Sequence, residues 1–101
     1  MKRRRVVFTP EARNDLFEIY DWIAEKASPQ IAITYIVRIE AYCLGFELAS
    51  ERGHRCDDIS PGLRIVGFER RVTIAFAVEE ERVTILRLFY GGQNWEEKFS
   101  C

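Results

Sequence analysis

Histidine, cysteine and proline are scarce in this 101-residue sequence, with one, three and three copies respectively. The cysteines, Cys43, Cys56 and Cys101, have no paired spacing, so they fit neither a disulfide framework nor a zinc site, and we expect reduced thiols. His54 lies two residues before Cys56, so the two could in principle form a base and a nucleophile. No neighbouring group would orient the ring as a third member, so a solvated loop histidine is the simpler interpretation.

Long hydrophobic runs and a positive charge excess are also lacking. The basic start MKRRR is followed by only three apolar residues before Thr9-Pro10, too few for a signal-peptide core, and no run of about 18 apolar residues exists. The net charge is -1, whereas proteins that grip the nucleic-acid backbone usually carry a clear positive excess. We therefore expect a cytoplasmic protein with no membrane segment and no direct, specific nucleic-acid binding.

Signals for a cofactor are missing too. Phosphate loops of the Walker or dinucleotide type are absent, and the acidic side of the first predicted helix has no histidine or converging partner. The pair Gly91-Gly92 is better interpreted as a backbone turn that ends a strand. We expect neither a metal nor a cofactor.

Helix caps and apolar periodicity are what the sequence does contain. Hydrophobic residues make up 48% and charged residues 31%, which predicts one compact domain spanning residues 1–101. After a short strand over residues 5–8, Thr9-Pro10 and Ser28-Pro29 each combine a capping hydroxyl with a proline suited to the first helical position. They predict helices over residues 10 to about 27 and 29 to about 50, followed by a loop over residues 51–62.

Three strand patterns follow the loop, over residues 63–68, 71–79 and 82–90. The turns between them are short, so we expect an antiparallel meander. The predicted fold is α+β: an N-terminal strand, a two-helix antiparallel hairpin and a three-stranded meander, with the helices packed on one face of the sheet.

The second predicted helix is apolar on two sides. One stripe comprises Ala32, Tyr35, Ile36, Ile39, Cys43 and Phe46, and the other Ile33, Val37, Leu44 and Leu48. Such a helix is either sandwiched within its own domain, which we favour because stripes are more often core, or it leaves a groove for a partner.

Two arginines, Arg64 and Arg87, lie inside apolar strand patterns. An unpaired charge buried there would cost several kcal/mol. Each guanidinium must therefore point to solvent, to a carboxylate or to a partner.

Several segments together resemble the ParE branch of the RelE/ParE toxin superfamily, over residues 6 to 97. They are Thr9-Pro10-Glu11-Ala12, Asp15-Leu16, Ile19-Tyr20 with Ile23, Asp58-Ile59-Ser60-Pro61-Gly62-Leu63-Arg64, Arg71 at a strand start, and Ile85-Leu86-Arg87-Leu88-Phe89-Tyr90-Gly91-Gly92. The resemblance implies the toxin of a bacterial type II toxin-antitoxin module, neutralised by a ParD-like antitoxin in a hetero-oligomer.

The superfamily contains two activities. RelE-type members are ribosome-dependent messenger RNA endonucleases, which need cations and a group that moves protons. Their two strand lysines fall on Gly62 and Arg64, one arginine on Arg71, the later arginine on Gln93 and the tyrosine near Phe99, so the set is only partly present. ParE-type members poison DNA gyrase by binding and need no active site. The segment Tyr90-Gly91-Gly92-Gln93 departs from their commoner ending, histidine followed by Gly-Arg-Arg.

The resemblance and the residue types suggest two binding sets and no catalytic residue. The target-binding candidates are Arg64, Arg71, Arg87, Tyr90, Asn94 and Trp95, because arginine and aromatic residues dominate interface energies. The antitoxin-binding candidates are Trp22, Ile33 and Val37. Two alternatives stay open: a ribonuclease that uses Arg64 and Arg71 with Tyr90 as proton donor, and an inactive homologue that only binds its antitoxin.

Overall fold

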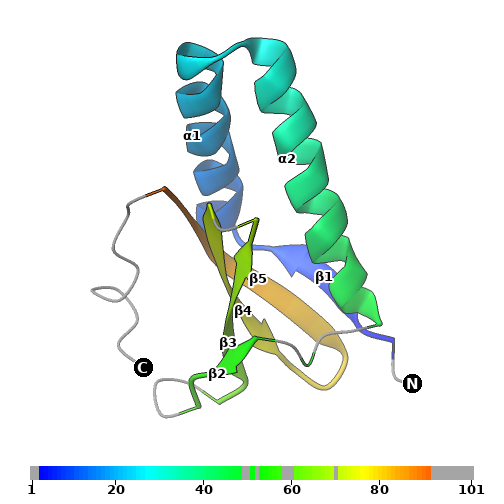
Figure 1. Ribbon diagram of the computed structural model, residues 1–101. Coiled ribbons are helices and arrows are strands. Elements are labelled where there is room, and N and C mark those ends of the chain that lie inside the picture. Colours follow the sequence, from blue (N-terminus) through cyan, green and yellow to red (C-terminus); the bar gives the residue numbers. More distant parts are fainter. Residues whose placement is uncertain (1–2, 49–50, 52, 58–60, 70, 92–101) are drawn as a thin grey trace.

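A computed structural model describes residues 3–48, 51, 53–57, 61–69 and 71–91. Its elements are β1 (Arg5–Phe8), α1 (Pro10–Lys26), α2 (Pro29–Leu44), a 3-10 helix η1 (Gly45–Glu47), β2 (His54–Arg55), β3 (Leu63–Phe68), β4 (Val72–Val78) and β5 (Arg82–Tyr90). Figure 1 shows α1 and α2 as a hairpin on one side of the sheet. The predicted α+β class and element order are confirmed.

Both helices begin at the predicted caps. The Thr9 hydroxyl accepts a hydrogen bond from the Ala12 N–H at 3.0 Å, and the Ser28 hydroxyl accepts one from the Ile31 N–H at 3.1 Å. Each cap satisfies an N–H that would otherwise lack a partner in the first turn. The second helix ends earlier than predicted, at Leu44, because the chain tightens into η1 from Gly45 onward.

The sheet contains five strands in the order β1-β5-β4-β3-β2. The antiparallel meander of β3, β4 and β5 is confirmed. β1 adds to it as an edge strand parallel to β5, with Arg5 opposite Arg82 and Phe8 opposite Ile85. The loop predicted over residues 51–62 includes the short strand β2, which pairs with β3. A strand of two residues carries too little pattern to stand out from a polar loop.

Two clusters of buried side chains lie on opposite faces of the sheet. The larger one joins both helices to the sheet and includes Ile19, Ile39, Phe46, Ile74, Phe76 and Ile85. The smaller one lies on the other face and comprises Cys56, Leu63, Ile65, Ala75 and Phe89. None of the described helices is long and apolar enough to cross a membrane.

The cysteines differ from the expectation of three reduced thiols. Cys43 is free and fully buried. Cys56 is fully buried as well, but it is disulfide-bonded. The prediction of an unpaired thiol is therefore wrong for Cys56, because wide sequence spacing does not prevent two cysteines from meeting in space. The bond also removes Cys56 as a nucleophile for His54.

Candidate functional surfaces

Arg87 forms an ion pair with Asp15 of α1. Its Nε donates to Asp15 Oδ2 at 2.8 Å and its Nη2 to Oδ1 at 3.1 Å, a bidentate arrangement. The Asp15 side chain is 5% exposed and that of Arg87 30%. Hydrogen bonding to Asp15 raises the pKa of Arg87. Of the three options for this arginine, the structure shows the carboxylate, so its guanidinium is already held within the chain.

The same carboxylate completes the hydrogen bonding of the β5 edge. Backbone pairing of β1 with β5 stops at Phe8 and Ile85. Beyond that point the Thr9 hydroxyl donates to the Leu86 carbonyl at 2.9 Å, and the Leu88 N–H donates to Asp15 Oδ2 at 2.9 Å. Thr9 and Asp15 therefore take the place of a strand neighbour for the part of β5 that β1 does not pair with. This role explains why Asp15 is buried in an otherwise apolar stripe of α1.

Tyr90 and Arg71 lie together at the other end of β5, beside the α1–α2 turn. A hydrogen bond to the Tyr90 side chain is the main cause that raises the pKa of Arg71. The Tyr90 ring lies 4.8 Å from the Trp22 ring and 6.1 Å from the Tyr35 ring, measured between centroids. The structure therefore brings together two target-binding candidates and one antitoxin-binding candidate, Trp22.

Tyr35 and Glu69 give this region two further features. Among the described side chains, the Tyr35 hydroxyl is the one buried polar group without a hydrogen-bond partner, which is unfavourable. Burial, then Glu69 and Tyr90, raises the pKa of Tyr35. Glu69 pairs with Arg38 and has a φ of 50°, the only positive φ among the described non-glycine residues. Such strain often accompanies functional sites.

A groove of about 380 Å³ runs between the outer sides of α1 and α2 and includes Phe17, Tyr20 and Ile33. Phe17 is 69% exposed, Ile33 52% and Val37 55%. Together with Leu44 and Leu48, these three form the outer apolar face of the hairpin. The favoured interpretation of α2 as a sandwiched helix is therefore wrong, because its second stripe faces outward.

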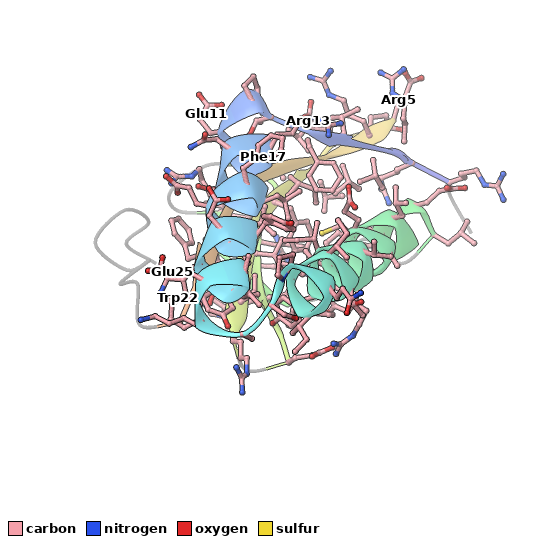
Figure 2. The ribbon with its side chains drawn as sticks, turned by 90° about the horizontal axis from the view of Figure 1, so that it is seen from above. Arg5, Glu11, Arg13, Phe17, Trp22 and Glu25 are labelled. Carbon is pink, nitrogen blue, oxygen red and sulfur yellow. The ribbon has the colours of Figure 1, made fainter. Side chains whose placement is uncertain are left out.

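Phe17 was not among the predicted contact residues. In Figure 2 it lies on α1 between Arg13 and Trp22. The sequence held a signal for it: Arg13, Phe17 and Tyr20 recur at helical spacing beside the core stripe and form their own side of the groove.

The remaining candidates do not join either region. Arg64 lies near the start of β3, opposite Phe76, whereas Arg71 lies just before β4, so the two occupy opposite ends of the β3–β4 pair. Asn94 and Trp95, together with Gln93 and Phe99, lie outside the described residues. Within the described ranges, no group of three histidine, cysteine or carboxylate side chains could hold a metal.

Comparison with known proteins identifies the family. The family model described as the ParE toxin of the type II toxin-antitoxin system parDE matches residues 6–95. The chain belongs to the ParE toxin family. No curated protein sequence matches it significantly.

Two solved structures share the fold of this ParE family member. The chromosomal ParDE toxin-antitoxin system of P. aeruginosa has a TM-score of 0.74 and 24% identity, covering 88% of this chain and 97% of the other. The toxin-antitoxin complex RelBE2 of Mycobacterium tuberculosis has a TM-score of 0.63 and 20% identity, covering 92% and 97%. The ParE and RelE branches therefore both match in fold, so the fold alone does not separate their activities.

Proposed function

We propose that this ParE family toxin acts by binding DNA gyrase, without catalysis of its own, and that a ParD-like antitoxin silences it by covering the helical hairpin. The observation that carries the proposal is the outer apolar face, where Phe17, Ile33 and Val37 are each more than half exposed. Contiguous apolar surface of this kind marks protein–protein contact.

The groove fits an amphipathic helix. Its floor and walls are apolar, and its lining also includes the charged residues Arg13 and Glu40. Helices bind such grooves through apolar residues spaced by three and four positions, and oppositely charged side chains at the rim would fix their direction. A disordered antitoxin segment that folds on contact supplies this chemistry, because ordering on binding lets it cover a long surface.

Ile33 and Ile31 offer a matched pair of substitutions for testing the antitoxin contact. They are 52% and 56% exposed on the same helix, but only Ile33 lines the groove. Ile33→Asp should weaken binding of the co-expressed antitoxin about tenfold or more in calorimetry, because it places a charge in an apolar contact. Ile31→Asp should bind within about twofold of the unchanged chain. Equal loss in both variants would show that the groove is not the contact.

Gyrase is tested directly by DNA supercoiling with the purified chain added. We expect inhibition and accumulation of cleaved DNA, reversed by the antitoxin. Arg71→Ala should reduce the inhibition, because this exposed arginine adjoins Tyr90, whereas Arg82→Ala should not, because Arg82 pairs with Glu79 at a distant turn. Absence of both inhibition and cleaved DNA would remove gyrase as the target. Cleavage of messenger RNA in a translation extract would instead support the ribonuclease alternative.

A further inference from the structure

A second cavity, of about 470 Å³, lies at the α1–α2 turn and is separate from the apolar groove. Its lining combines aromatic rings with positive charge, including Trp22, Lys26, Tyr35, Arg38, Arg71 and Tyr90. We propose that this cavity binds a free nucleoside monophosphate, with the base against Trp22 and the phosphate between Lys26 and Arg71. This ligand function is additional to binding of gyrase and the antitoxin, although it shares Trp22, Arg71 and Tyr90 with those proposed contacts.

The charges of the cavity suit a phosphate monoester. Among the described residues, three cations line it, Lys26, Arg38 and Arg71, against one carboxylate, Glu69. Glu69 is already paired with Arg38, which leaves Lys26 and Arg71 for a ligand that carries up to two negative charges. Arg71 is exposed and is positioned by Tyr90, so its remaining N–H groups can take phosphate oxygens in a fixed geometry.

The Tyr35 hydroxyl provides an independent sign of a missing ligand. The Tyr35 residue is 8% exposed, and its hydroxyl has no partner among the described residues. The charged and phenolic groups that act on this hydroxyl are Glu69, Tyr90, Arg71 and Arg38, and all four line the cavity. The hydroxyl therefore lies beside Glu69, Arg38 and Arg71 in the cavity wall, and a phosphate oxygen held by Arg71 would supply the partner it lacks once the side chains that cover it shift.

The aromatic side chains of the cavity suit the nucleobase of the proposed ligand. Trp22 is 48% exposed although it lies next to Tyr90, so much of its surface is open to a planar ligand. Any nucleobase can stack on a tryptophan ring, because every base has a planar π face. An acidic peptide would satisfy the cations but would leave this ring without a planar partner, which favours the nucleotide.

Trp22 also serves as the probe. In a Trp95→Phe chain it is the only tryptophan, since the sequence has two. Titration with adenosine 5′-monophosphate should quench its fluorescence saturably, and adenosine or inorganic phosphate alone should bind about tenfold more weakly or worse. Arg71→Ala should weaken the nucleotide about tenfold, and Tyr35→Phe should weaken it measurably while the fold is retained in circular dichroism. Arg82→Ala is the control and should not change the titration.

Three outcomes would overturn the proposal. They are absence of saturable quenching at millimolar nucleotide, binding of adenosine as tight as that of the monophosphate, and binding that Arg71→Ala leaves unchanged. Tighter binding of an acidic peptide, with no nucleotide binding, would reassign the cavity to a protein partner. Supercoiling and antitoxin assays play no part in these readouts, so the nucleotide site and the toxin function can fail separately.

Discussion

The two sides of α2 have similar apolar side chains but opposite environments. Ala32, Tyr35, Ile36, Ile39 and Cys43 on the sheet side are at most 8% exposed, whereas Ile33, Val37 and Leu44 on the other side are 52–55% exposed. Burial of apolar area stabilises the fold only on the first side. Apolarity on the second side adds nothing to the described core, as the proposed antitoxin contact requires.

The largest expected effect separates the two sides by stability. Ile39→Ala removes a fully buried side chain and should lower the free energy of unfolding by about 3 kcal/mol, through lost burial and a residual cavity. Val37→Ala, on the exposed side, should change it by less than about 0.5 kcal/mol. Urea denaturation monitored by circular dichroism measures both. Similar losses in the free energy of unfolding would show that the two sides of α2 do not differ in their contribution to stability.

Asp15 tests whether the buried side depends on more than apolar packing. Asp15→Asn keeps the size of the side chain but removes the charge opposite Arg87 and weakens the cap on the Leu88 N–H. We expect a loss of about 2 kcal/mol, below the cost of breaking a fully buried pair because Arg87 keeps some solvent access. Glu25→Gln, also exposed on α1 and not among the charges that act on Arg87, is the control. A loss no greater than that of the control would mean that the pair contributes little.

The buried thiol of Cys43 should make the stability of the fold depend on pH, which tests the buried side of α2 in another way. Burial, followed by the nearby Glu40, raises the pKa of this thiol from 9.0 to about 12. The unfolded chain ionises first, so the stability from the neutral buried thiol is complete below pH 9 and is lost as pH rises toward about 12. At about pH 10 the loss should be about 1 kcal/mol. Comparison of unfolding curves with those of Cys43→Ala isolates it, and parallel pH dependence in the two chains would contradict it.

Tyr35→Phe should have the smallest effect on stability. Its hydroxyl is buried without a partner, so removing it leaves no hydrogen bond broken. We expect a change within about 0.5 kcal/mol, or a slight gain, in the same denaturation assay. A clear loss of stability would reveal a partner for the hydroxyl in solution and would weaken the ligand site.

Local signals made much of the fold predictable. Thr9-Pro10 and Ser28-Pro29 predicted both helix starts, because capping depends on residues within one turn. The alternation through β4 likewise predicted a strand with a core face, at Val72, Ile74 and Phe76. The end of α2 at Leu44 and the strand β2 were not predicted, because neither is marked by a sequence pattern longer than a few residues.

The candidate site was less predictable because its parts meet only in space. Helical periodicity placed Trp22, Ile33 and Val37 on one side of their helices, and the structure exposes all three. The sequence pattern placed Tyr35 in the core stripe and gave no reason to single it out. Its surroundings, with Glu69, Arg71 and Tyr90 close to the hydroxyl, follow from the tertiary structure.

Local patterns predicted the two helix starts, the four longer strands, their order and the two apolar stripes on α2, since these depend on neighbours within a few residues. Which stripe is buried, and what Arg87 contacts, depends on tertiary packing. Asp15 is 72 positions away from Arg87 in the chain, and no local spacing encodes that meeting. It requires α1 to lie along the β5 edge where β1 ends, because there a carboxylate can satisfy both a strand N–H and a guanidinium at once.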